Sequence, residues 1–370
     1  MLKPSYKIPS LPPAVNLDTV VILKALACST RALAELKGRA SSIPNPGILI
    51  DTLSLQEAKA SSEIENIVTT HDELFQADLF PEGASSPAAK EVALYRAALR
   101  SGYQGLIDTD GLLPNNVLVE MFQLLKNRDD GFRSTQGTVL RHDRTGQTVY
   151  VPPQSEAEII GHMRDLEHFI NEGEASDLDP LIKMALIHHQ FESIHPFPDG
   201  NGRIGRILNV LYLTQSGLLD IPILYLSRYI TENKAEYYRL LQAVRDEGVW
   251  EEWILYILKA VEETAITTLH LVNSIREQMA TMKHRMRTEV PKLYSQDMLN
   301  NLLRHPYTRI EFVVNDLGVT RQTASRHLDA LAGAGFVTKH QSGRSNYYVN
   351  EPLVRLFLDT ADGTSLPEQP

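Results

Sequence analysis

The sequence predicts a mainly α-helical protein with one β-hairpin near its middle and a small module of two helices and a hairpin near its C-terminus. Helical periodicity dominates residues 21–80, 89–128 and 156–287, where prolines and glycines mark the breaks. Two further segments, 138–151 and 336–349, each hold a pair of β-prone runs around residues that favour turns. Long helical stretches with only two short hairpins are typical of a mainly α fold.

The composition is that of an ordinary soluble globular protein. Of its 370 residues, 43% are hydrophobic and 22% charged, so we expect two or three domains, each able to bury a core. The formal net charge of −10 excludes a surface that binds nucleic acid as a whole, so any basic patch has to be local. Cys28 is the only cysteine, which rules out an intrachain disulfide and fits a reducing cytosol. No run of about 18 apolar residues and no signal pattern occurs, which favours a cytoplasmic protein with no membrane partner.

The first part of the chain is expected to be extended and then helical. Prolines punctuate residues 1–20, which we expect to run over the surface. A helical pattern follows over 21–80 with a break at 43–47, and a loop rich in proline, glycine and serine covers 80–89. The helical pattern then returns.

A β-hairpin is expected next. The β-prone runs 138–141 and 148–151 enclose a turn at 144–146, and two prolines at 152 and 153 end the second run. Beyond the hairpin, helical patterns cover 157–172, 180–193, 201–216, 233–246 and 250–283.

The C-terminal part changes character. A tight turn at 316–320 joins two short amphipathic helices, of which the second, 320–332, begins with Thr320 as its N-cap. Two β-prone runs, 336–339 and 346–349, then flank a turn that carries Arg344. This order predicts a winged helix-turn-helix domain. We expect the tail at 359–370 to be disordered.

The segment 195–206, His-Pro-Phe-Pro-Asp-Gly-Asn-Gly-Arg-Ile-Gly-Arg, holds the most chemistry in the chain. A helix that ends near Ser193 would deliver His195 to a loop, where Gly200 and Gly202 permit close approach of a ligand to the backbone. A helix that starts near Asn201 would point its free N–H groups into the same loop. The segment therefore predicts an anion site that suits phosphates.

Charged side chains complete this predicted phosphate site. Arg203 and Arg206 share a helix face and can reach phosphate oxygens, and Asp199 is suited to Mg²⁺. His195 can accept a proton from an attacking hydroxyl near neutral pH. Taken singly, Asp199 is explained equally well as a helix cap and His195 as a buried structural histidine. A metal site is a further alternative, on the helix-face spacing of His188, His189, Glu192 and His195.

The segment resembles the signature of Fic-family proteins, His-x-Phe-x-Asp/Glu-Gly-Asn-Gly-Arg-x-x-Arg, at every fixed position, and the resemblance extends over most of residues 50–260. It implies transfer of AMP from ATP to a protein hydroxyl, with His195 as the general base and Asp199 holding Mg²⁺. It further implies that Phe197 anchors the loop and that Arg206 grips the γ-phosphate. The residues that cradle the phosphates by this resemblance are Gly200, Asn201, Gly202 and Arg203.

Two other segments take roles from the same resemblance. The hairpin at 138–151 corresponds to the family's flap, whose edge pairs with an extended target segment; a purely structural hairpin is compatible with this role. Ser61-x-x-x-Glu65-Asn66 is similar to the family's inhibitory-helix motif. The resemblance implies that Glu65 pairs with Arg206 and occupies the place of the γ-phosphate, although a solvated helix carboxylate is the plain alternative for Glu65.

These observations divide the chain into four successive regions. We expect an N-terminal helical region with the inhibitory helix at 1–90, a Fic catalytic core at 91–287, a winged helix-turn-helix at 288–358 and a tail at 359–370. Tyr229 and Tyr237 are aromatic enough to stack on adenine, with core packing as the alternative.

The predicted winged helix carries a modest positive charge. Four basic residues against Asp329 give a local charge of +3 over 318–345. Duplex DNA is therefore a candidate partner, while dimerisation, including a homodimer, and protein docking are the alternatives. The candidate DNA contacts are Arg321, Gln322, Arg326 and Arg344.

The sequence thus predicts an adenylyltransferase that uses ATP and Mg²⁺ on a Ser, Thr or Tyr of a protein, itself included, with Glu65 as an inhibitor. The alternatives are removal of AMP, transfer of another phosphate-containing group in the same fold, and a DNA-binding regulator that senses nucleotide. A histidine-rich metalloenzyme is a more distant alternative.

Overall fold

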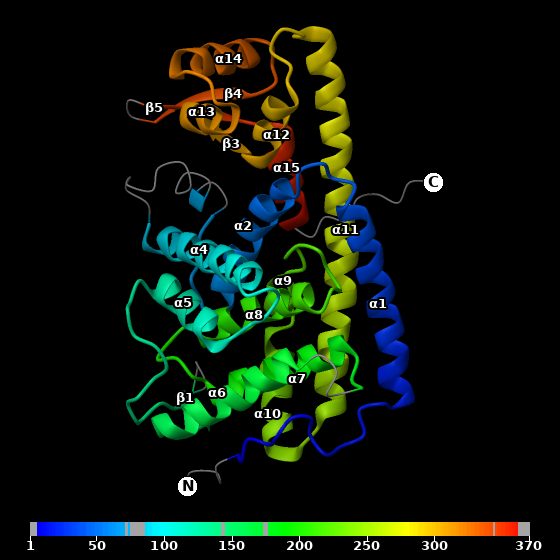
Figure 1. Ribbon diagram of the computed structural model, residues 1–370, viewed down its shortest axis with the longest axis vertical. Helices are drawn as coiled ribbons and strands as arrows, with labels where there is room; N and C mark the ends of the chain where they lie inside the picture. The colour runs from blue at the N-terminus through cyan, green and yellow to red at the C-terminus, as the bar shows by residue number, and fades with distance from the viewer. Residues whose placement is uncertain are drawn as a thin grey trace. The chain divides into compact units, whose positions relative to one another are not determined.

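The computed structural model describes residues 6–70, 73–74, 86–141, 145–172, 177–342 and 345–361. As predicted, this described part of the chain is mainly helical, and its strands form two small antiparallel sheets (Figure 1). Within these described residues, no helix combines the length and apolar character that a membrane span requires.

The chain forms two compact units that interleave along the sequence. The first unit combines Met1–Lys37, Ala60–Ile67 and Leu94–Ala265. The second combines Gly38–Lys59, Val68–Ala93 and Ile266–Pro370. Among the helices that the structure describes, those that contribute residues to both units are α1 (Val20–Ala40), α2 (Pro46–Ile64), α4 (Pro87–Asp108) and α11 (Trp250–Glu289). The division into four successive regions stays a prediction.

The first unit is built around two buried helices, α7 (Pro180–Ile194) and α8 (Asn201–Gln215), which pack against each other. Every residue of α7 after Pro180 is buried, so this helix lies in the core on all sides although it carries polar residues such as His188 and Glu192. Asp179 starts it, since its carboxylate accepts a hydrogen bond of 2.8 Å from the Leu181 N–H and Pro180 occupies the first helical position. The other elements of the unit are α5 (Asn115–Lys126), β1 (Leu140–Arg141), β2 (Thr148–Tyr150), α6 (Glu156–Asn171), α9 (Ser227–Glu232) and α10 (Lys234–Glu247).

The hairpin is shorter than the sequence suggests. β1 pairs with β2 in antiparallel fashion, with an irregularity in register after Leu140. Residues 142–144, which include part of the expected turn, lie outside the described residues. The hydroxyl of Tyr150 donates a hydrogen bond of 2.8 Å to the Ser193 carbonyl, which ties β2 to the end of α7.

The second unit contains the expected order of helix, turn, helix and hairpin. Gly318 ends α13 (Ile310–Leu317) at a φ of 65°, and the Thr320 hydroxyl caps α14 (Arg321–Gly333). The hairpin strands are β4 (Thr338–Ser342) and β5 (Ser345–Val349). Two elements precede this order, α12 (Gln296–Arg304) and β3 (Tyr307–Arg309), and β3 completes a sheet of order β3-β5-β4.

The end of the described chain differs from the expectation. Helix α15 spans Glu351–Ala361, so the first three residues of the expected disordered tail are helical instead. Leu353, Val354 and Phe357 are buried with helical spacing, which explains why the chain forms a helix here. Residues 362–370 lie outside the described residues.

Candidate functional site

The candidate site lies where α7 ends and α8 begins. His195 follows α7 in a left-handed conformation with a φ of 50° and a ψ of 58°, and Gly200 precedes α8 with a φ of 74°. No side chain caps the N-terminus of α8. The first backbone N–H groups of α8 therefore have no capping side chain and face the loop, which is the arrangement that binds anions.

Two side chains fix the shape of this loop. Phe197 is fully buried and stacks on Phe122 at a centroid distance of 4.4 Å, so its ring anchors the loop as predicted. The side-chain amide of Asn201 accepts a hydrogen bond from the Phe197 N–H and donates one to the Phe197 carbonyl, both of 2.8 Å. Asn201 thus closes the loop with its side chain, and only its backbone N–H remains for a ligand.

His195 is held as a neutral imidazole. Burial lowers its pKa to about 3, and the positive charges of Arg245 and Arg133 act in the same direction. The backbone of Glu192 and the charge of Asp199 oppose this shift. At neutral pH the ring is therefore deprotonated, which is the form in which a general base acts, and burial makes it a weak base in this state.

Asp199 lies in the same loop with its carboxylate partly in solvent. One oxygen accepts a hydrogen bond of 2.7 Å from the Gly200 N–H, and the other lies 2.6 Å from the ammonium of Lys126. Partial burial acts to raise the pKa of Asp199, but Lys126, Gly200 and Arg203 outweigh it and lower that pKa. The carboxylate is thus ionised and already accommodates a cation, which fits a ligand for Mg²⁺.

Both arginines of the motif are buried on α8 and share one carboxylate. Arg203 Nε lies 2.7 Å from Glu65 Oε2, and Arg206 Nη2 lies 3.2 Å from Glu65 Oε1. The arginine side chains are 1% and 2% exposed, while that of Glu65 is 24% exposed. Burial acts to lower the pKa of Arg206, but the charge of Glu65 raises it overall. Gly202 gives room for this contact, since a Cβ there would lie 2.9 Å from Arg206 Nη1 and 3.1 Å from Glu65 Oε1.

Ser61 completes the contact with α2. Its hydroxyl and its carbonyl accept hydrogen bonds of 2.8 and 2.9 Å from Arg206. Asn66 has a φ of 64° just after the helix, a conformation that glycine and asparagine adopt readily. The structure thus brings Ser61, Glu65 and the two arginines together, and Arg203 is a partner of Glu65 in addition to Arg206.

Sequence reasoning missed several residues around the site. Lys126 forms a salt bridge with Asp199. Near the end of α2, Thr231 donates a hydrogen bond of 3.3 Å to the Ala60 carbonyl, and Lys234 donates one of 2.5 Å to the Ile64 carbonyl. These are isolated polar residues on other helices. A preference for cations at a helix C-terminus favoured Lys126, which ends α5, whereas Lys234 begins α10 and had no such signal.

The alternative of a histidine-rich metal site is wrong for the described residues, which contain no group of three His, Cys, Asp or Glu able to hold a metal ion. Both ring nitrogens of His188 contact protein groups, the Tyr237 hydroxyl at 2.8 Å and the Asn209 amide at 3.1 Å. Tyr237 is buried in this cluster, so it packs in the core. Glu192 is buried nearby, and burial raises its pKa to about 7.

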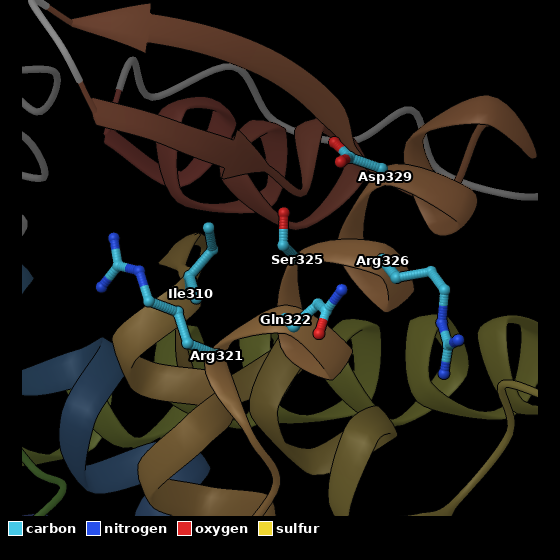
Figure 2. Close-up of a pocket in the computed structure, with 6 residues that line it drawn as sticks. All are labelled: Ile310, Arg321, Gln322, Ser325, Arg326 and Asp329. Carbon is cyan, nitrogen blue, oxygen red and sulfur yellow. The ribbon is translucent and has the colours of Figure 1, made fainter.

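Three of the four candidate DNA contacts lie on α14. Arg321, Gln322 and Arg326 line an open hollow of about 670 Å³, with the arginines extending away from each other in Figure 2; Ile310, Ser325 and Asp329 complete its lining. Arg321 pairs with Glu311, and Lys339 lies 2.6 Å from Asp329. The local charge of +3 therefore overstates the field available to a phosphate backbone, because Glu311 lies outside the range counted. Arg344 lies outside the described residues.

Three family models match the chain. The Fic/DOC family N-terminal model covers residues 23–104, and the Fic/DOC family model covers residues 116–213 with the entire candidate loop. The chain belongs to the Fic/DOC family. A third model, for the C-terminal domain of SoFic-like protein adenylyltransferases, matches residues 278–353 of this Fic chain.

Curated relatives match parts of the Fic chain. A probable protein adenylyltransferase of Aquifex aeolicus is 30% identical over 187 residues, which are 49% of this chain and 54% of the relative. A protein adenylyltransferase of Caenorhabditis elegans is 33% identical over 124 residues, 32% of this chain and 22% of the relative. The chain thus spans between about a fifth and about half of the length of these relatives.

Solved structures share the Fic fold at low identity. A Fic family protein from Desulfovibrio desulfuricans has a TM-score of 0.54 at 21% identity, over 91% of this chain and 98% of that one. A Fic protein from C. elegans also has a TM-score of 0.54, at 20% identity over 69% of this chain and 74% of that one.

Proposed function

We propose that this Fic chain is a protein adenylyltransferase that transfers AMP from ATP to a Ser, Thr or Tyr hydroxyl of a protein, itself included. The observation that carries the proposal is a neutral His195 beside the uncapped N-terminus of α8, with two buried arginines on that helix. The names of the curated relatives support the same reaction. A cytoplasmic location stays a prediction from the single cysteine.

The reaction assigns one role to each group. The target hydroxyl attacks the α-phosphorus, its proton passes to His195, and the bond to pyrophosphate breaks. Gly200, Asn201 and Gly202 offer backbone N–H groups to the phosphates, and Arg203 and Arg206 offer guanidinium donors. These fixed donors stabilise the charge that develops during transfer, because they need no reorganisation.

Mg²⁺ fits the carboxylate of Asp199. The ammonium of Lys126 lies 2.6 Å from this carboxylate, and this contact with a cation supports the proposal. The ion would be held by Asp199 and phosphate oxygens, and it would neutralise charge on the phosphates.

We also propose that Glu65 inhibits this reaction. Its two carboxylate oxygens lie at salt-bridge distance from Arg203 and Arg206 and occupy the donors that a γ-phosphate would use. ATP bound in this state would lack both arginine contacts, so its α-phosphorus would be poorly aligned with the target hydroxyl.

A transfer assay tests both proposals. The wild type, Glu65→Gly and Glu65→Gly/His195→Ala are incubated with Mg²⁺, a lysate and ATP labelled at the α- or the γ-phosphate. We expect protein-bound α-label that increases in Glu65→Gly and disappears in the double variant. Label from the γ-phosphate alone would replace adenylylation by phosphoryl transfer, and no label from either would refute the proposed reaction. Equal α-label in wild type and Glu65→Gly would refute the inhibition alone.

A second proposal concerns the hollow on α14, for which duplex DNA is the candidate ligand. The observation that favours it is the set of exposed side chains suited to phosphates and base edges, Arg321, Gln322 and Arg326, on one helix. An electrophoretic shift that is weakened by salt and by Arg326→Ala would support it. Binding that neither change affects, or no binding at low salt, would refute it.

A further inference from the structure

We infer that Arg133 is the positioning residue of this site: its guanidinium holds the backbone of His195 and joins it to the base of the hairpin. This inference rests on the proposed function, in which His195 is the general base. Arg133 itself touches no reacting atom in this assignment.

The contacts of Arg133 converge on the end of α7. Its Nε donates a hydrogen bond of 2.8 Å to the carbonyl of His195, and its backbone N–H donates one of 2.8 Å to the carbonyl of Pro196. Its Nη2 lies 3.4 Å from the Ile194 carbonyl. One residue thus binds three consecutive carbonyls around the general base.

His195 needs such support because of its conformation. A non-glycine residue at a φ of 50° is in a sparsely populated region, which persists only where surrounding contacts fix it. The last carbonyls of α7 also lack partners within the helix. Arg133 satisfies the carbonyls of Ile194 and His195 at this position and keeps the left-handed turn closed.

The same guanidinium reaches the hairpin. Its Nη2 donates to the carbonyl of Pro153, in the segment directly after β2. The general base and the strand that is expected to hold the target therefore share one anchor. The planar fork of arginine directs donors from separate atoms, Nε and Nη2, at carbonyls that lie apart, whereas a lysine ammonium directs its three donors from a single atom.

Arg133 is also buried, at 2% exposure, and burial acts to lower its pKa. A buried cation is costly unless its hydrogen bonds are satisfied. The carbonyls around His195 and that of Pro153 provide such bonds for Nε and Nη2, while Nη1 is buried without a hydrogen-bond partner among the described residues. The position of Arg133 therefore depends on these carbonyls, and the loop that carries them is held by Arg133.

The test uses steady-state kinetics in the Glu65→Gly background, with Arg133→Met, Arg133→Lys and a control, Arg128→Ala. Arg128 lies in the same loop but is exposed and pairs with Asp130. Misplacement of a reacting group by about 1 Å can lower a reaction rate roughly 100-fold. We therefore expect Arg133→Met to lower kcat by about 100-fold, and Arg133→Lys to have a kcat about tenfold higher than that of Arg133→Met. The KM for ATP and the binding of ATP should change less than about twofold, because the phosphates are held by α8.

A second readout separates positioning from folding. The charged and titratable groups that face His195 are Arg245, Arg133 and Asp199, together with the backbone of Glu192. Loss of one cation in Arg133→Met should raise the His195 pKa, which ¹⁵N-histidine NMR follows without any turnover, while Arg133→Lys should keep it near the wild-type value.

The outcomes are distinguishable. A folded Arg133→Met that retains full kcat, or one that loses ATP binding in parallel with kcat, would overturn the inference. If Glu65→Gly with Arg133 intact transfers no AMP, the proposed function fails instead, and the NMR comparison still tests whether Arg133 sets the surroundings of His195.

Discussion

Replacement of Glu65 by glycine should make the protein less stable and more responsive to ATP. The change leaves Arg203 and Arg206 buried without their shared carboxylate. Breaking a buried ion pair in this way typically costs about 3–5 kcal/mol. The lower end, about 3 kcal/mol, applies here, because Glu65 is 24% exposed and Arg206 keeps its hydrogen bonds to Ser61. For a unit of roughly 200 residues, this corresponds to a fall in Tm of about 6–12 °C.

ATP should reverse much of this loss. At a concentration of 100 times its Kd, a ligand stabilises the folded state by about 2.7 kcal/mol. In the wild type part of this gain is offset, because the phosphates compete with Glu65 for the arginines. We therefore expect thermal unfolding monitored by fluorescence to show a larger ATP-induced shift in Glu65→Gly than in the wild type.

Two variants control this experiment. Glu65→Gln keeps the size of the side chain and removes its charge, so it should behave like Glu65→Gly. Glu63→Gly, in the last turn of α2, adds the backbone freedom of glycine and leaves the ion pair intact. Equal ATP-induced shifts in wild type and Glu65→Gly would refute the reasoning that Glu65 and ATP compete for one place.

Three further predictions apply in the uninhibited background. Asn201→Ala removes two hydrogen bonds that close the loop and should cost about 1–3 kcal/mol in urea unfolding together with most of the activity; unchanged values of both would contradict the role of the clamp. Lys126→Met removes a cation that competes for Asp199, so a magnesium titration should reach half-maximal activity at lower Mg²⁺, and an unchanged or higher requirement would argue against competition. Because the pKa of His195 is about 3, the rate should stay constant between pH 8 and pH 5 with respect to this group, since the base is lost only as the pH falls through its folded pKa. A loss of rate below about pH 6.5 in the measured pH–rate profile would contradict this prediction if it also occurs in Glu192→Gln. The Glu192→Gln variant is needed because the pKa of Glu192 is about 7, so titration of Glu192 could produce the same loss.

The local part of the site was predictable from sequence. The positive φ of Gly200 and the start of α8 at Asn201 follow from local conformational preferences, and they define the loop that contains His195. The role of Asn201 was less predictable. A side-chain amide suits a phosphate as well as a backbone clamp, and only the position of Phe197 decides between the two.

The long-range part could not be derived from residue patterns. Glu65 lies far from Arg203 in the sequence, and only the resemblance to the family linked α2 to the site. Even so, it linked Glu65 to Arg206 alone, although Arg203 lies closer to the carboxylate. Arg133 stands in a loop with no periodicity, where a lone arginine is normally an exposed cation. Its burial depends on how α7 and the hairpin pack, which no local pattern encodes.

The arrangement of α8 explains why one carboxylate can control the site. Two arginines buried side by side repel each other and need an anion, whatever its source. Glu65 supplies that anion in the observed structure, and the phosphates of ATP would supply it during transfer. The ion pairs of Glu65 stabilise the fold in the absence of ATP. ATP has to replace these ion pairs, so the same free energy reduces the favourable free energy of ATP binding. Any partner that draws α2 away from Arg203 and Arg206 would weaken both the stabilisation and the inhibition that Glu65 provides. The activity of the protein and the dependence of its stability on bound nucleotide should then increase together.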